Sequence, residues 1–356
     1  MIYEDYAIFT PGPVKMSQEI LNIGAKQTPY FRNSAFSEVV LKSETLLLKM
    51  LNAPKGSRII FLTASGTAGL ESVIMNLLSK KDNAIVINGG GFGQRFVDIC
   101  ESYTIPHTDY KVANTNLSNI AEIVNPSEYN TFIMNAHETS IGHLYNLEAT
   151  GAFCKENGLL NIVDAISMFV TDGIDMQKHH IDAVILSSQK GLALPPGLTM
   201  VALNPTAINK ISNIQSHYFN FKNYLKDGER GQTPYTPAVT IILQLLARLE
   251  QIDRDGGVKQ SIKKAREIAM YFREQIKDLP LKEFTPYMPN AMTTLTSTNG
   301  VSAMKIVEDL ENNYKVIVCP NGGELKDIVF RVSHMGDMSF EYVDTLINAL
   351  RVYLEQ

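Results

Sequence analysis

The sequence predicts an α/β fold, in which a mainly parallel central sheet has helices on both faces and a small α+β domain follows at the C-terminus. From Arg58 to about Asn204, short apolar runs of strand length alternate with helical stretches, a pattern typical of parallel strands joined by crossover helices. About the last hundred residues depart from this alternation. With 356 residues, 45% of them hydrophobic, the chain is long enough for one large and one smaller domain.

We expect three parts: an N-terminal arm (1–14), a large domain (15–237) and a small domain (238–356). The arm is irregular, because the prolines of the Thr10–Pro13 segment fit neither a helix nor a central strand. Gly12, between two prolines, either lets bare backbone approach a ligand or forms an ordinary turn.

In the large domain, Ser17 is expected to cap a short helix, and a second helix starts after Asn33–Ser34 and runs through Leu46–Leu48. The strands that follow are recognised as apolar runs bounded by turn residues. They are Arg58–Leu62, Ala84–Asn88, Thr131–Asn135, Leu159–Asp164, Ala183–Leu186 and Leu198–Leu203. Helical stretches between them include Ala68–Leu78 and Gln94–Tyr103.

Residues 218–237 are rich in Tyr, Gly, Asn and Pro and predict a loop. A long helix from Ala238 to about Ile252 leads out of the large domain. The small domain then has predicted strands near Ala291–Thr296, Val316–Cys319 and Ile328–Val332 and a closing helix over Phe340–Leu354.

Composition excludes several classes of function. A net charge of −5 and a pI near 5.9 offer no electrostatic surface for nucleic acid. No apolar run is long enough to span a membrane and the first residues do not resemble a signal peptide, so we expect a cytoplasmic protein. Three widely spaced cysteines and His179-His180 match no metal-binding or disulfide pattern. No GxSxG, Walker or GxGxxG motif is present.

Two charged residues mark the ends of predicted strands. Lys190 follows the apolar run Ala183–Leu186, and Asp164 ends the preceding strand. In open α/β sheets, ligands bind outside the carboxyl ends of the strands, so both side chains are expected at the same crevice. An amine held there can form a Schiff base. A solvated surface lysine and a capped turn are the alternatives.

Two further segments join a strand to a helix. Ser65, Gly66 and Thr67 combine a capping serine, free N–H groups and hydroxyls, which suits a phosphate, although a plain helix start is the alternative. In the glycine-rich stretch Gly89–Gly93, Phe92 can lie flat on a planar ring or belong to the core. An anion site, a stacking ring, a buried aspartate and a strand-end lysine together match what pyridoxal 5'-phosphate needs.

At this point the chain resembles the class V (fold type I) pyridoxal-phosphate-dependent aminotransferases, in the branch of alanine–glyoxylate, serine–pyruvate and 2-aminoethylphosphonate–pyruvate aminotransferases. The resemblance covers nearly the whole chain. It rests on Thr10–Pro13, Ser65–Thr67, Gly91–Arg95, Glu138–Gly142, Val163-Asp164, Ser187–Lys190 with Pro195–Gly197, and Phe330–Gly336.

The resemblance implies a role for each matching residue. Lys190 would form the internal aldimine, Asp164 would hold the pyridine nitrogen, and Phe92 would stack on the ring. Ser65, Gly66, Thr67 and Gln189 would line the phosphate, with Thr139 near the ring oxygen. In homodimers of this family a loop of the second subunit also reaches the phosphate, and 232–237 matches it, with Thr236 as the expected contact.

For the substrate, the resemblance implies that Arg331 binds the carboxylate, while Gly12 and Arg32 lie at the mouth of the site. The reaction would move an amino group from alanine, serine or 2-aminoethylphosphonate to pyruvate or glyoxylate. The chain departs from the family at Phe31, often histidine, and at Ile141, often threonine. Two other functions stay open: a cysteine desulfurase or lyase of the same fold that uses Cys319, and a non-catalytic sensor that binds the cofactor.

Overall fold

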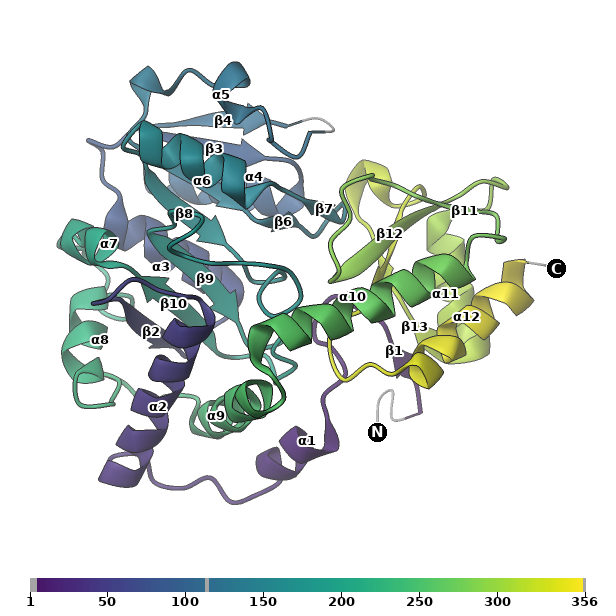
Figure 1. Cartoon of the computed structure of the whole chain (residues 1–356), viewed down its shortest axis with the longest axis horizontal. Helices are drawn as coiled ribbons and strands as arrows, with labels where there is room; N and C mark the ends of the chain where they lie inside the picture. Colours follow the sequence, from purple (N-terminus) through teal and green to yellow (C-terminus); the bar gives the residue numbers. More distant parts are fainter. Residues whose placement is uncertain (1–4, 113–114, 355–356) are drawn as a thin grey trace.

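The fold is known from a computed structural model that describes residues 5–112 and 115–354. Figure 1 shows a large sheet with its helices on the left and a smaller sheet with its helices on the right. The large sheet has seven strands in the order β2-β10-β9-β8-β5-β3-β4. These are β2 (Arg58–Leu62), β3 (Ala84–Asn88), β4 (His107–Lys111), β5 (Thr131–Asn135), β8 (Leu160–Asp164), β9 (Ala183–Ser187) and β10 (Thr199–Leu203).

The predicted mainly parallel sheet is confirmed. From β9 to β4 all neighbours pair in parallel, and only β10 runs antiparallel to both β9 and β2. The strand that the sequence did not predict is β4, whose residues His107–Lys111 are polar and mostly half-buried. An edge strand needs no apolar run on both faces, so the periodicity gave no signal there.

Helices cover both faces of the large sheet, as predicted. One layer contains α1 (Gln18–Gly24), α2 (Ser34–Met50), α5 (Ile120–Ile123), α6 (Leu147–Glu156) and α9 (Val239–Arg254). The other contains α3 (Gly66–Leu77), α4 (Gly91–Ser102), α7 (Pro205–Lys210) and α8 (Phe221–Gly228). Ser17 caps α1 as expected, accepting a hydrogen bond from the N–H of Ile20.

The prediction of a loop throughout residues 218–237 was wrong, because α8 lies within it. The Asn220 side chain caps this helix by accepting a hydrogen bond from the N–H of Lys222. Phe221 and Tyr224 are buried in the core beneath. An asparagine that looks like a turn residue therefore starts a helix here, since the first turn has a buried apolar side to pack.

The small domain is built on the sheet β11-β12-β15-β14. Its strands are β11 (Leu281–Glu283), β12 (Met292–Ser297), β14 (Cys319–Pro320) and β15 (Phe330–Ser333). The helices are α10 (Gly257–Gln275), α11 (Ala303–Tyr314) and α12 (Phe340–Leu354). In the arm, β1 (Ala7–Ile8) pairs in parallel with β13 (Val316–Ile317) of this domain.

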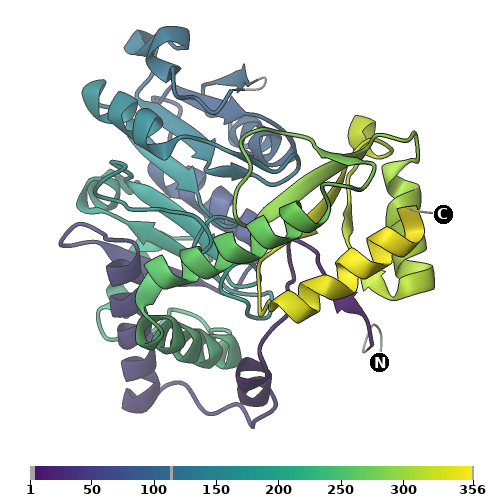
Figure 2. The same cartoon turned by 45° about the vertical axis from the view of Figure 1, so that its right-hand side comes forward.

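The two domains are joined by α9 and α10, which follow one another through Asp255-Gly256. Val239, Ile242, Leu245 and Leu249 of α9 belong to the hydrophobic core of the large sheet. From there α10 runs across the molecule to the small sheet, as both views show (Figures 1 and 2).

Candidate active site

Asp164 and Lys190 meet at the carboxyl end of the large sheet. β8 and β9 are parallel neighbours, and Asp164 lies opposite Ile185 in their register. Lys190 follows β9 after a turn at Ser188-Gln189, so both side chains leave the sheet on the same edge. The crossover between two adjacent parallel strands thus positions both groups, as the spacing in the sequence predicts.

The Asp164 carboxylate is buried and held by two hydrogen bonds. Its Oδ1 accepts from the N–H of Ile166 at 2.8 Å, and its Oδ2 accepts from the side chain of Asn135 at 2.8 Å. Burial raises the pKa of Asp164 to about 6, although both hydrogen bonds oppose this rise. Above that pH the site holds a buried negative charge that a cationic ring nitrogen would neutralise.

The Lys190 amine is largely desolvated, and two arginine side chains act on it electrostatically. Burial lowers the pKa of Lys190 to about 8, and Arg331 and Arg95 lower it further, while Asp164 raises it. Among the described residues its Nζ makes no hydrogen bond and no ion pair. An uncharged, unpaired amine is nucleophilic, which covalent attachment to an aldehyde requires.

The arm packs directly on Lys190. Gly12 has a φ of 141°, and a Cβ atom there would lie 2.8 Å from Cδ and 2.9 Å from Cε of Lys190. Both the backbone conformation and the space therefore require glycine at this position. The bare backbone of Gly12 therefore lies against the Lys190 side chain, while its approach to a ligand stays a prediction.

The residues predicted to cradle a phosphate, Ser65, Gly66 and Thr67, lie at the N-terminus of α3. Ser65 is its N-cap residue, but its side chain makes no capping hydrogen bond, contrary to the plain capping role. The Ser65 hydroxyl and the N–H groups of Gly66 and Thr67 make no hydrogen bond with the described residues, so they remain available to an anion. Thr67 accepts a hydrogen bond from Nη1 of Arg95 at 3.1 Å, which adds a cation.

Gly66 and Gln189 bring the cradle next to the lysine. A Cβ on Gly66 would lie 2.7 Å from Cδ1 of Ile166 and 3.5 Å from Ser187. The hydroxyl of Ser187 in turn donates to the Gln189 side chain at 2.6 Å. The predicted phosphate residues Ser65, Gly66, Thr67 and Gln189 therefore lie together, three at the helix start and one just before Lys190.

Phe92 is held in place by a residue whose role sequence reasoning missed. The buried carboxylate of Glu138 accepts hydrogen bonds from the N–H groups of Phe92 at 3.3 Å and Gly93 at 2.9 Å, in the first turn of α4. The guanidinium of Arg95 lies 4.9 Å from the Phe92 ring centroid. A carboxylate at a helix N-terminus is stabilised there, so Glu138 fixes the backbone of the turn that carries Phe92.

Thr139 takes part in a buried chain of hydrogen bonds. Its hydroxyl lies 2.7 Å from that of Ser167, which lies 3.0 Å from Nδ1 of His137. Burial lowers the pKa of His137 to about 3, so this ring is neutral. His137 and Ser167 were not predicted, although both belong to the strand-end segments that carry Thr139 and Asp164.

Arg331, on β15 of the small domain, reaches across to the large domain. Its Nη1 donates to the carbonyl of Thr139 at 3.2 Å, and its Nη2 donates to the carbonyl of Pro320 at 2.7 Å. The Sγ of Cys319 lies 2.9 Å from Nη2. The guanidinium is thus beside both Thr139 and the lysine amine, in a position suited to a carboxylate.

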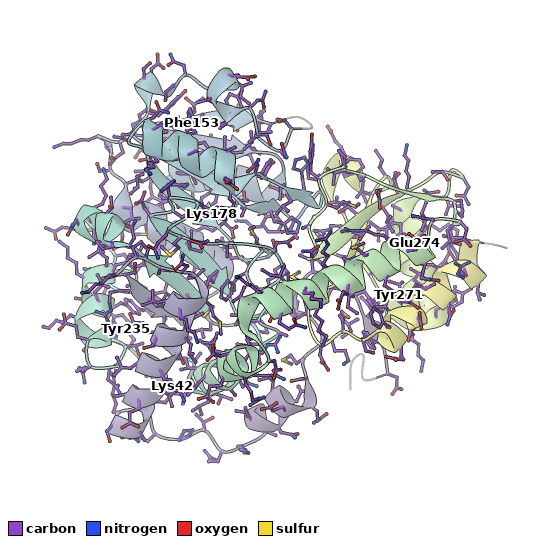
Figure 3. All side chains as sticks on the ribbon, in the orientation of Figure 1. Lys42, Phe153, Lys178, Tyr235, Tyr271 and Glu274 are labelled. Carbon is purple, nitrogen blue, oxygen red and sulfur yellow. The ribbon has the colours of Figure 1, made fainter. Side chains whose placement is uncertain are left out.

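Arg32 and Thr236 lie in a different place. Arg32 donates to the Gln232 side chain at 3.2 Å, to the carbonyl of Thr233 at 2.7 Å and to that of Pro234 at 3.3 Å. None of these contacts involves Lys190 or Asp164. Figure 3 shows Tyr235 at the outer left side of the large domain, away from Tyr271 and Glu274 on the small-domain helix α10.

The residues at the strand ends fit pyridoxal 5'-phosphate. A partly uncharged lysine, a buried carboxylate, an aromatic ring and a helix start with a nearby arginine each match one part of that molecule. Two buried polar atoms, Oδ1 of Asn135 and Nε2 of His137, also have no partner within the described chain. Each of these atoms leaves a hydrogen bond that a polar group other than the described residues would have to make.

The described residues contain neither a cluster of metal ligands nor a membrane-spanning helix. No group of three or more His, Cys, Asp or Glu side chains there could hold a metal ion. None of the described helices is long and apolar enough to cross a membrane.

Comparison with known proteins agrees with this geometry. The family described as Aminotransferase class-V matches residues 24–335. An uncharacterized aminotransferase of Helicobacter pylori strain J99 is 27% identical, covering 98% of this chain and 93% of its own length. The L-aspartate–glyoxylate aminotransferase of Paracoccus denitrificans is 24% identical, covering 93% of this chain and 87% of its own length.

Among solved structures, a subgroup IV aspartate aminotransferase from Thermus thermophilus superposes with a TM-score of 0.88 at 25% identity, covering 98% of this chain and 99% of that one. The predicted resemblance and the fold type I architecture are therefore confirmed. The chain belongs to the class-V aminotransferase family, whose members are pyridoxal-phosphate-dependent enzymes that move an amino group from a donor to a keto acid.

Proposed function

We propose that the protein moves the amino group of a small amino acid, alanine or serine, to glyoxylate or pyruvate, with Lys190, Asp164 and Arg331 as its central residues. The observation that carries this proposal is the position of Arg331, whose guanidinium lies at the carbonyl of Thr139 and acts electrostatically on Lys190. A carboxylate bound by Arg331 has its α-amino group within reach of the site's reacting groups.

The cofactor supplies an aldehyde to receive the amino group and a ring that withdraws electrons from the substrate's α-carbon. The chain's own residues do the rest. The Nζ of Lys190 would hold the cofactor and, once free, would take the proton from the substrate's α-carbon as a general base and give it back as a general acid. Its lowered pKa keeps a useful fraction of the amine uncharged near neutral pH.

Asp164 and the residues around it hold the ring. Its carboxylate would pair with the protonated ring nitrogen and keep that proton in place. Phe92, fixed by Glu138, would cover one side of the ring and exclude water. Ser65, Gly66, Thr67 and Gln189 would bind the phosphate, with Thr139 at the ring oxygen.

The donor follows from the position of Arg331. Alanine and serine carry the α-carboxylate that a guanidinium binds in a bidentate pair, whereas 2-aminoethylphosphonate has its anion farther from the amine. We therefore place alanine and serine ahead of 2-aminoethylphosphonate. The name of the Paracoccus relative supports glyoxylate as the acceptor.

A half-reaction panel tests this function. The purified, cofactor-loaded protein is mixed with alanine, serine, 2-aminoethylphosphonate or aspartate, and the change in cofactor absorbance is followed. We expect alanine or serine to convert the cofactor fastest. In Arg331→Lys, the donor concentration for half-maximal rate should rise roughly tenfold or more, because a bidentate charged contact is lost. Unchanged donor dependence in that variant would remove Arg331 from the proposal.

A cysteine desulfurase is the second candidate, because the Cys319 thiol lies beside Arg331. Two observations favour the aminotransferase. Cys319 is paired in β14 with β15 instead of lying on a free loop. Burial also raises the pKa of its thiol, which disfavours the reactive thiolate. Sulfide released from cysteine by the wild type but not by Cys319→Ala would reverse this preference.

A non-catalytic sensor is the remaining alternative. Such a sensor would bind the cofactor, but its function would not require an uncharged lysine near an arginine that binds a carboxylate. In such a protein no amino compound of the panel would change the cofactor spectrum. Borohydride treatment and peptide mapping would locate the covalent link, which we propose at Lys190.

We further propose a homodimer in which the 232–237 loop of one subunit, held by Arg32, reaches the phosphate of the other through Thr236. We propose a cytoplasmic protein, since all three cysteines are free thiols. For the domains, we keep the arm at 1–14. The core that α9 shares with the large sheet supports a boundary near Asp255 rather than Pro237.

A further inference from the structure

A cavity of about 440 Å³ lies between the two domains, on the side of α9 and α10. One wall is formed by the large domain with α1, α9 and the loop after Lys190, and the other by α10 and the segment 334–338 of the small domain. The volume is that of a small-molecule site. None of the residues assigned to the cofactor or the substrate lines it.

Arg248 of α9 is the deepest charged group of this cavity. Its Nη1 donates to the side chain of Gln251 at 2.6 Å, while its Nε is buried and has no acceptor among the described residues. Asp337, Asp255 and Glu19 act on it electrostatically but form no ion pair with it, and burial lowers its pKa. The edge formed by Nε and Nη2, which a carboxylate binds in a bidentate pair, therefore has no partner in the part of the chain that the structure describes.

The lining carries two cationic side chains, Arg248 and Lys264, and three acidic ones, Asp255, Glu267 and Asp337. Lys264 of α10 lies at the exposed rim and makes no ion pair with the described residues. Each acidic residue of the lining has a basic neighbour instead. Asp337 pairs with Lys15 at 3.0 Å, Asp255 with Arg254 at 3.5 Å, and Glu267 with Lys263 at 3.9 Å. Arg248 and Lys264 thus remain for a ligand with two negative groups.

The walls of the cavity continue into the active site. Gly191, directly after Lys190, lines the cavity, and a Cβ on it would lie 2.3 Å from the carbonyl of Phe169, so this backbone cannot move independently of its neighbours. On the opposite wall, His334 comes three residues after Arg331. A ligand between these walls therefore contacts the segments that carry the two charged groups of the reaction.

We propose that this cavity binds a small dicarboxylate, with one carboxylate at Arg248 and the other at Lys264, and that the bound anion favours one relative position of the two domains. The Arg248 side chain turns slightly so that its Nε and Nη2 donate to the ligand. Binding itself does not depend on the proposed function, whereas its effect on the reaction does.

Calorimetric titration of the cofactor-loaded protein with succinate tests the proposal. We expect one bound succinate per subunit at this cavity, and about tenfold weaker binding in Arg248→Gln, because a bidentate charged contact is lost. Acetate and inorganic phosphate serve as comparison probes and should bind more weakly, since neither can reach both cations. Arg230→Gln, an exposed arginine that pairs with Asp227 and does not line the cavity, should bind succinate as the wild type does.

Further variants separate this cavity from the active site. The proposal predicts that succinate still binds to Arg331→Lys and binds more weakly to Lys264→Gln. It also predicts that Ser261→Phe, whose larger side chain fills the cavity, does not bind succinate. Thermal unfolding checks that each variant is folded. If Arg248→Gln does not fold, succinate binding by Ser261→Phe tests the proposal in its place. Binding lost only in Arg331→Lys, or no binding of succinate at all, would overturn it. If binding holds, succinate should shift the KM for the amino donor in the wild type but not in Arg248→Gln.

Discussion

The residues predicted to serve the reaction lie in two regions that differ in how the fold holds them. The strand-end cluster, formed by Asp164, Lys190, Thr139 and Arg331, is assembled within one subunit by parallel strands and one interdomain contact. The rim loop, residues 232–237, is tied by Arg32 to the outer side of the large domain. A strand end determines where a side chain lies, whereas the rim loop would reach a cofactor only if a second subunit faces it, as we propose.

The largest expected effect comes from a substitution in the strand-end cluster. Lys190→Ala should reduce the rate of amino transfer by about a thousandfold or more, because both the attachment point and the base are lost. Lys178→Ala, an exposed lysine that pairs with Glu148, is the matched control and should keep full activity. Rates are measured at saturating donor. Comparable activity in the two variants would exclude Lys190 from the chemistry.

A second effect depends on pH and distinguishes the two charged groups of the cluster. Only the uncharged amine attaches the cofactor, so the loading rate of the cofactor-free protein should fall about tenfold per pH unit below the Lys190 pKa of about 8 and level off above it. Absorbance of the added cofactor reports the rate.

Protonation of Asp164 should change the stability of the cofactor-free protein and the affinity for the cofactor in opposite directions. Its folded pKa of about 6 is raised, so protonation below pH 6 relieves a buried charge and stabilises the cofactor-free protein, while the pairing with the ring nitrogen is lost. Asp164→Asn should remove both trends. A loading rate that does not change between pH 6 and 9 would contradict the assigned pKa of Lys190.

The smallest effect concerns the rim loop. Arg32→Ala should weaken cofactor binding a few-fold to about tenfold, because the loop loses its hydrogen bonds to the guanidinium. Thr236→Val should give a similar change if Thr236 donates to the phosphate. Equilibrium dialysis of the cofactor measures both, and Arg230→Ala, an exposed neighbour paired with Asp227, is the control.

A mixed dimer tests which subunit's rim loop contacts the phosphate. A subunit with Lys190→Ala can still lend its rim loop to a Thr236→Val partner, so the hybrid should bind cofactor more tightly at its one loading site than the Thr236→Val homodimer does. Equal affinity in the hybrid and the homodimer would mean that the loop serves its own subunit.

The sequence by itself determined the large sheet and the positions of Asp164 and Lys190. An apolar run that ends in a polar group encodes both a buried strand and a strand-end side chain, and parallel neighbours must place such ends on one edge. Where the signal was weak, at the polar edge strand β4 and in the helix α8, the structure was needed.

Only the tertiary structure decided which distant segments meet. The contact of Arg331 with the carbonyl of Thr139, the hold of Glu138 on Phe92 and the attachment of Arg32 to the rim loop join residues far apart in the chain. The cavity around Arg248 arises in the same way, between helices of two domains. Local patterns specify how each segment folds, but contacts between segments depend on the packing of the whole chain, which no short stretch of sequence encodes.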